Sequence, residues 1–206
     1  MIGKLLTVIA ATITGIISSL GYGGVVLLMA IESACIPLPS EIVMPFSGYL
    51  VYKGAFSLWG VSLAGALGNV LGSLVAYYVG LRGGRPLVQK YGRYLLISHH
   101  DLDLADFWFG RFGDITILVG RLLPVVRTFI AFPAGVARMA LGKFVAYTFV
   151  GSLIWCAALA WVGERLGEHW ESLGPWFHRF DAFIAAALLL AAAWWIWRHL
   201  RHARQG

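Results

Sequence analysis

Long apolar runs alternate with short charged segments along this chain. Four of the runs, at residues 5–20, 55–81, 143–163 and 181–198, are long enough or nearly long enough to cross a membrane. A membrane-spanning helix needs about 20 mostly apolar residues. We therefore expect an all-α membrane protein, a single domain over residues 1–206, with about four full spans.

Two further apolar stretches, residues 22–53 and 115–142, are interrupted by prolines and charges. The interruptions are Glu32, Pro37, Pro39, Glu41 and Pro45 in the first stretch and Arg121, Pro124, Arg127 and Pro133 in the second. Each half holds roughly ten residues, or about 15 Å of helix, which is half the hydrocarbon thickness. Because broken backbone within a membrane must be buried in protein or line a cavity, we interpret both stretches as re-entrant hairpins.

The positions of Lys and Arg predict the orientation. The loop at residues 82–114 opens with Arg82, Arg85, Lys90 and Arg93, and three arginines follow the last span, so both segments are expected in the cytoplasm. The acidic segment at 164–180 is expected outside, and both termini inside. Ser98 and Asp101 have the spacing of a capping box that opens an amphipathic helix in the cytoplasmic loop.

Glycines suggest that the two halves of the chain are related. Gly68 and Gly80 match Gly151 and Gly163 in spacing. Upstream, Gly48 pairs in the same way with Gly135. A hairpin followed by a span, repeated with opposite orientation, is the inverted repeat typical of transporters.

A stripe of small residues runs along the second span, at Ala64, Gly68, Gly72, Ala76 and Gly80. Such stripes allow close approach of helix backbones. We favour packing within one chain, with a homo-oligomer as the alternative. Asn69, beside the stripe, is expected to form a hydrogen bond between helices.

Glu32, Glu41, Arg121 and Arg127 all fall within the two hairpins. A charge at mid-bilayer costs about 2.5–3.5 kcal/mol on insertion scales, so these side chains must pair, hydrate or neutralise. We expect the carboxylates to face the guanidinium groups. An inert neutral cluster is the structural alternative, although apolar residues would fill the space at lower cost.

The two residue types differ in chemistry. Arginine stays charged and binds phosphate or carboxylate through two parallel hydrogen bonds. The pKa of a glutamic acid can rise on burial, so that it carries a proton. The combination indicates an anionic substrate coupled to protons.

Composition excludes several other functions. Only 13% of the 206 residues are charged, about half the share of a soluble domain, so a soluble enzyme is excluded. The net charge of +6 comes from short loops beside apolar runs, which indicates membrane orientation and no nucleic-acid partner. Cys35 and Cys156 lack metal-ligand spacing and are interpreted as packing residues. We expect no cofactor, no metal and no enzymatic chemistry.

The charged motifs also carry a family resemblance. Residues 32–41 read E-x4-P-x-P-x-E and residues 121–127 read R-x2-P-x2-R. Together with Gly48 and Gly135, and over most of residues 15–165, the chain resembles the DedA family, whose domain is also called SNARE-associated or VTT. The resemblance implies a bacterial inner-membrane protein built from two opposed re-entrant hairpins. Several family members are similar to proton-dependent flippases that recycle undecaprenyl phosphate, and eukaryotic relatives are lipid scramblases.

From residues and resemblance together we predict a lipid-phosphate flippase driven by the proton motive force. Arg121 and Arg127 would bind the phosphate, and Glu32 and Glu41 would couple protons. The hairpins would be shaped by Pro37, Pro39, Gly48, Pro124, Pro133 and Gly135. The alternatives are a proton-coupled exchanger of small ions, an energy-independent phospholipid scramblase, and a scaffold that transports nothing.

Overall fold

The computed structural model describes residues 12–34, 36, 39–95, 107–123 and 126–167, with the backbone alone for 85–95. The chain divides into two units, and the fold below is that of residues 13–167. Residues 5–11 of the expected first span, the Ser98 cap and the last span at 181–198 lie outside the described residues. So do Cys35, Pro37, Pro124 and residues 168–180 of the outer loop. Within the described ranges every regular element is a helix.

Among the residues that the structure describes, two helices are long and apolar enough to cross a membrane. They are the Leu58–Gly84 part of α4 (Leu58–Leu95) and the whole of α9 (Leu141–Arg165), with 27 and 25 residues. At 1.5 Å per residue each exceeds the roughly 30 Å of hydrocarbon. They correspond to the expected spans at 55–81 and 143–163. The spanning part of α4 ends at Gly84, whose non-helical backbone (φ 51°, ψ −155°) separates it by a kink from the helix that reaches Leu95.

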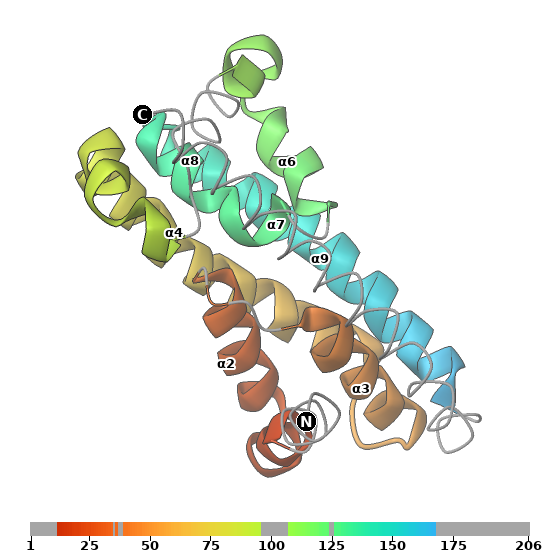
Figure 1. Cartoon of the computed structure of the whole chain (residues 1–206). Coiled ribbons are helices and arrows are strands. Elements are labelled where there is room, and N and C mark those ends of the chain that lie inside the picture. The colour runs from red at the N-terminus through yellow and green to blue at the C-terminus, as the bar shows by residue number, and fades with distance from the viewer. Residues whose placement is uncertain (1–11, 35, 37–38, 96–106, 124–125, 168–206) are drawn as a thin grey trace, which may run out of the picture. The chain divides into compact units, whose positions relative to one another are not determined.

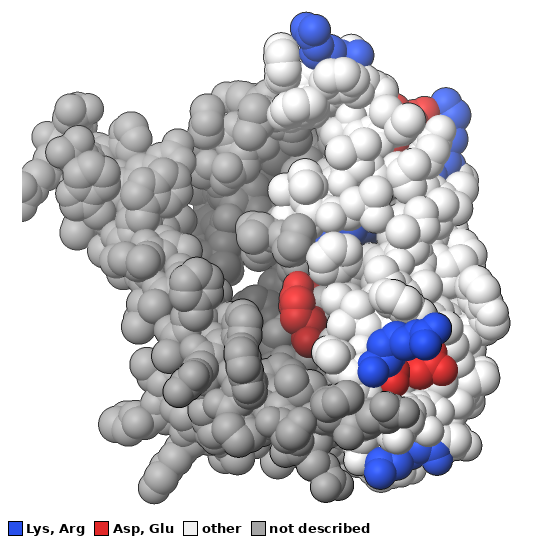
Figure 2. Space-filling view, turned by 90° about the vertical axis from the view of Figure 1, so that its right-hand side faces the viewer, with Lys and Arg blue, Asp and Glu red and all other residues white. Residues whose placement is uncertain are grey.

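The outer faces of these helices suit contact with lipid. Exposed apolar side chains recur every four residues along α4, at Leu63, Leu67, Leu71, Val75 and Val79. Figure 2 shows a face that is mostly uncharged, with Lys and Arg side chains gathered toward its upper and lower ends. An apolar band between charged ends is what a membrane protein presents.

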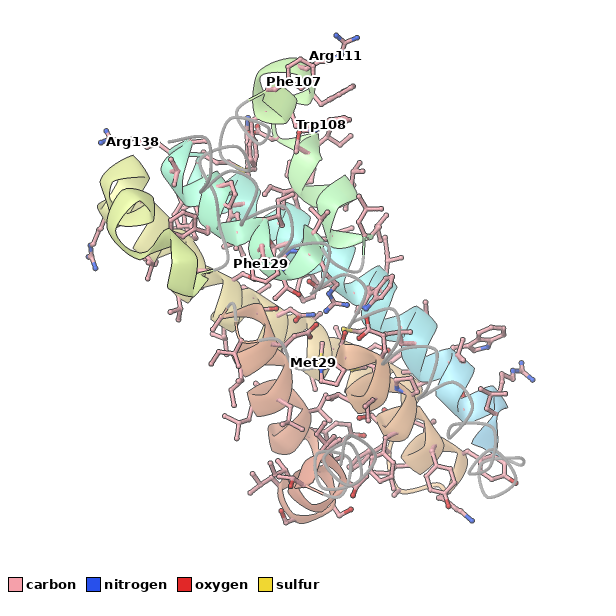
Figure 3. The ribbon with its side chains drawn as sticks, viewed as in Figure 1. Met29, Phe107, Trp108, Arg111, Phe129 and Arg138 are labelled. Atoms are coloured by element: carbon pink, nitrogen blue, oxygen red, sulfur yellow. The ribbon has the colours of Figure 1, made fainter. Side chains whose placement is uncertain are left out.

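Exposed aromatic side chains lie near both ends of this band. Trp59 is at the start of α4 and Trp161 is near the end of α9. At the other end, Phe107 and Trp108 project beyond α6 together with Arg111 (Figure 3). Tryptophan is enriched at membrane–water interfaces, so these side chains mark the two borders of the bilayer.

The interrupted stretches form short helices. The first contains α2 (Tyr22–Ser33) and α3 (Ser40–Tyr52), and the second contains α6 (Ile115–Arg121), α7 (Val126–Phe129) and α8 (Ala131–Val136). The longest has 13 residues, about 20 Å, which is too short to cross a bilayer. The prediction that both stretches break into pieces shorter than a span is confirmed.

The short helices pack on the long ones in a crossed pattern (Figure 1). In the first half α2 packs on α4, the long helix that follows it, and α3 packs on α9. In the second half α6 packs on α9, its own following helix, and α8 packs on α4. In each half, the last short helix therefore packs on the long helix of the other half. The same packing pattern in both halves is expected if the two halves are related.

The matched glycines form close backbone contacts in this arrangement. Gly48 on α3 lies against the carbonyl oxygen of Ala160 on α9, and Gly135 on α8 lies against that of Tyr77 on α4. In both places an added Cβ would overlap the backbone of the other helix.

Reciprocal glycines complete each contact. Gly80 on α4 meets the carbonyl oxygen of Phe132 on α8, and Gly163 on α9 meets that of Pro45 on α3. Two of the pairs that were matched by spacing, Gly48 with Gly135 and Gly80 with Gly163, thus have matching contacts in the fold.

Arg138 has a left-handed backbone, with φ 53°, directly after α8. Its backbone N–H donates to the carbonyl oxygen of Gly135 at 3.0 Å, and the N–H of Met139 donates to the carbonyl oxygen of Ala134 at 3.1 Å. These two bonds form a Schellman cap, in which glycine usually holds the position of Arg138.

We expect Arg138→Gly to raise the free energy of unfolding by about 1 kcal/mol, because a left-handed conformation costs a non-glycine residue about 1–2 kcal/mol. Thermal melting of the protein in detergent measures the change. Arg138→Ala is the matched control, since it removes the charge and keeps the strain. Equal stabilisation by both variants would mean that charge, and not backbone conformation, is responsible.

Candidate functional site

Two arginine side chains are almost completely buried. Arg121 ends α6 with 1% of its surface exposed, and Arg127 lies in α7 with 2% exposed. Glu32, near the end of α2, is 4% exposed. The Arg127 Nη2 donates to Glu32 Oε2 at 3.4 Å. One carboxylate of the first stretch is therefore paired with one guanidinium group of the second.

Asn69 on α4 holds this ion pair from the side. With its amide turned so that each atom faces a complementary partner, its oxygen accepts from Arg127 Nη2 at 3.2 Å. Its nitrogen then donates to the Met29 carbonyl at 3.2 Å and to Ser33 Oγ at 2.6 Å. The expected hydrogen bond between helices is confirmed, and it also fixes one edge of the arginine.

An aromatic ring supports the other side of Arg127. The guanidinium carbon lies 5.1 Å from the ring centroid of Trp155, on α9. This cation–π contact stabilises the charge without engaging its N–H groups in the plane of the guanidinium. Arg127 thus has contacts from α2, α4 and α9.

Arg121 is held by the two long helices. Its Nη2 donates to Ser73 Oγ on α4. On α9, a Cβ built on Gly151 would lie 2.7 Å from the Cβ of Arg121. A larger residue at position 151 would therefore clash with the arginine side chain. The position at the end of α6 also suits a cation, because the negative end of the helix dipole lies there.

Glu41 is placed differently from Glu32. It lies in the first turn of α3, is exposed, and accepts from Ser40 Oγ at 3.5 Å. We expected two carboxylates to face two guanidinium groups, and the structure shows this for Glu32 and Arg127. Arg121 donates to Ser73, and Glu41 is exposed.

The polar side chains gather midway along the ribbon. Figure 3 shows their nitrogen and oxygen atoms between Met29 of α2 and Phe129 of α7. Of the predicted hairpin residues, Pro39 caps the start of α3 and Pro133 lies in the first turn of α8.

A family model described as the VTT domain matches residues 38–165 of the chain. The chain belongs to the VTT-domain family, also called DedA. The resemblance drawn from the two charged motifs is confirmed.

The chain is similar to several named bacterial members of the VTT-domain family. It is 39% identical to the uncharacterized membrane protein YkoX of Bacillus subtilis, over 83% of this chain and 76% of the relative. It is 36% identical to undecaprenyl phosphate transporter A of B. subtilis, over 76% and 77%. The protein of that name in Staphylococcus aureus is 27% identical over 91% and 95%. No solved structure matches the chain.

The residues that support the arginines of this VTT domain were not identified by sequence reasoning. Ser73, Trp155 and the role of Asn69 toward Arg127 appear only in the fold. The available signal is periodic: Asn69 and Ser73 are four residues apart in an otherwise apolar helix, as are Thr148 and Ser152 in α9. All four side chains are buried.

Proposed function

We propose that this VTT-domain protein is a lipid-phosphate transporter that moves undecaprenyl phosphate across a bacterial inner membrane, using the proton motive force. The observation that carries the proposal is the burial of Arg121 and Arg127 in helices too short to cross a bilayer. Guanidinium groups bind phosphate well and are too costly to bury for packing alone. The names of the two transporter relatives support the same substrate.

In the proposed topology α2–α3 and α6–α8 are re-entrant hairpins that enter the membrane from opposite sides. The end that carries Arg82, Arg138 and Lys143 faces the cytoplasm, in keeping with the positive-inside rule. The crossed packing of the short helices on α4 and α9 supports an inverted repeat. Together with the first and last apolar runs, the protein would have four full spans and cytoplasmic termini.

The proposed cycle exchanges one anion for another at Arg127. Without substrate, the carboxylate of Glu32 is paired with the guanidinium group of Arg127. A phosphate head group that takes its place releases the carboxylate, which then binds a proton, while the polyprenyl chain remains in lipid. Release of the phosphate on the other side restores the ion pair, and Glu41, on the surface, is the second proton carrier. A single charge that moves through 100 mV gains about 2.3 kcal/mol, a bias of roughly fiftyfold.

The test is reconstitution in liposomes with fluorescent undecaprenyl phosphate, with and without an imposed pH gradient. We expect the gradient to accelerate movement of this lipid, while fluorescent phosphatidylglycerol stays in its leaflet. Arg121→Ala should abolish the movement, because one of the two phosphate-binding groups is lost. Liposomes without protein give the background rate.

The same assay separates the alternatives. Equal movement of both lipids without a gradient would identify a scramblase. Proton flux without lipid movement would identify a small-ion exchanger. Neither flux, from protein that melts cooperatively, would contradict transport altogether.

A further inference from the structure

Three buried polar atoms on α9 have no hydrogen-bond partner within the part of the chain that the structure describes. They are Thr148 Oγ1, Ser152 Oγ and Trp155 Nε1. Thr148 is 0% exposed and Ser152 is 1% exposed. Buried polar groups are nearly always bonded, since an unsatisfied one costs about 1–3 kcal/mol. Three such atoms within eight residues call for a common explanation.

One of these three side chains contacts an arginine, and the other two share its side of α9. Thr148, Ser152 and Trp155 are four and three residues apart, the spacing that puts side chains on one side of a helix. The Trp155 ring lies under the Arg127 guanidinium, and Gly151, in the same turn as Ser152, contacts Arg121.

Arg127 itself has one nitrogen in the same condition. Its Nη2 is engaged by Glu32 and Asn69, whereas its buried Nη1 has no partner among the described residues. The guanidinium group is therefore bound through Nη2, while the N–H groups of Nη1 can donate to a ligand.

We propose that Thr148, Ser152 and Trp155 form, with Arg127 Nη1, a binding site that selects phosphate monoesters. The indole and guanidinium nitrogens only donate hydrogen bonds, and the two hydroxyl groups can turn to donate. A set of four donors fits an anion whose oxygens only accept. This inference rests on the proposed function and adds the residues that would set its specificity.

The donor number distinguishes a monoester from a diester. A phosphate monoester has three terminal oxygens, which together can accept from all four donors. A diester has two, and its second ester group would occupy the space of the third. The α9 donors would then be left partly unsatisfied beside a diester, which is the way a polar site rejects a wrong ligand.

Dodecyl phosphate and dodecyl methyl phosphate are suitable probes, since they share the alkyl chain and differ by one methyl ester, which also removes the second negative charge. Variants of α9 that keep both arginines separate the effect of the donors from that of charge. The affinities of both probes are measured by calorimetry with the full chain in detergent. We expect the wild type to bind dodecyl phosphate at least about tenfold more tightly. The double variant Thr148→Val and Ser152→Ala should lose about ten- to a hundredfold in affinity for dodecyl phosphate, and most of the preference.

The stability of the ligand-free variant gives a second, opposite readout. Removal of unsatisfied hydroxyl groups should leave the melting temperature unchanged or raise it. Ser62→Ala is the control, because that buried hydroxyl donates to the Leu58 carbonyl at 2.7 Å. It should lower the melting temperature and leave both affinities unchanged. Trp155→Phe should weaken dodecyl phosphate binding while the ring stays under Arg127.

Two results would overturn the inference: unchanged affinity for dodecyl phosphate in the double variant, or a melting temperature that falls as far as in Ser62→Ala. Failure of the proposed function has a different signature. In that case wild-type protein binds dodecyl phosphate through α9 yet moves no lipid in liposomes, whereas wild-type protein that binds neither probe would overturn the inference as well.

Discussion

Arg127→Ala is expected to reduce lipid-phosphate transport at least about a hundredfold and to destabilise the protein by about 3–5 kcal/mol. Both effects have the same origin: the variant removes a phosphate donor and leaves the carboxylate of Glu32 buried without its partner. Loss of one member of a buried ion pair is among the most destabilising changes known. Flux in liposomes measures the first effect, and denaturant unfolding in detergent measures the second.

A second variant separates these effects. Glu32→Gln combined with Arg127→Met removes both charges, so much of the lost stability should return because no unpaired charge remains. Transport should stay abolished, because the phosphate donor is still missing. Recovery of stability and transport together would show that the ion pair only stabilises the fold and that transport does not need the Arg127 guanidinium group.

Much of the fold follows from where charge and proline interrupt apolar runs. Proline removes a hydrogen bond of the helix and a charge is costly in lipid, so breaks were expected in the stretches at 22–53 and 115–142. The expectation was wrong at Pro45, which lies inside α3. The spans around Gly68 and Gly151 followed from length and apolarity alone. The helix that follows the expected span, up to Leu95, was less predictable, since a kink at a single glycine, Gly84, separates it from the spanning part of α4.

The pairing of charges could not be predicted from spacing. Glu32 and Glu41 lie nine positions apart on different helices, so their burial depends on how α2 and α3 pack. α2 carries Glu32 toward Arg127, whereas Glu41 begins α3 at the surface. Only the tertiary arrangement distinguishes two acids that look equivalent in the motif.

The hydrogen-bond partners of the arginines could not be predicted from the sequence for a related reason. A serine or asparagine in a membrane helix costs far less than a charge, and it is equally consistent with helix packing. Asn69 and Ser73 become arginine partners because α7 and α6 deliver those arginines to one side of α4. Periodicity identifies the side of the helix but not the partner.

Gly48→Ala and Gly135→Ala are each expected to destabilise the protein by about 3 kcal/mol, at the upper end of overpacking costs. At both positions the added Cβ would overlap a backbone carbonyl of a long helix. A backbone cannot turn aside as a side chain can, so the helices must separate. Denaturant unfolding in detergent should show similar losses for both, because the two contacts correspond in the two halves of the fold.

Gly142→Ala is the matched control for this prediction. Gly142 is exposed in the first turn of α9, and an added Cβ would meet no atom within 4 Å. Alanine should stabilise the helix there by about 0.5–1 kcal/mol, because glycine loses more backbone entropy on folding. If Gly48→Ala and Gly135→Ala behaved like Gly142→Ala, the crossed helix contacts would be looser than the structure has them. The case for two related halves, each packed on the long helix of the other, would then lose its tightest contacts.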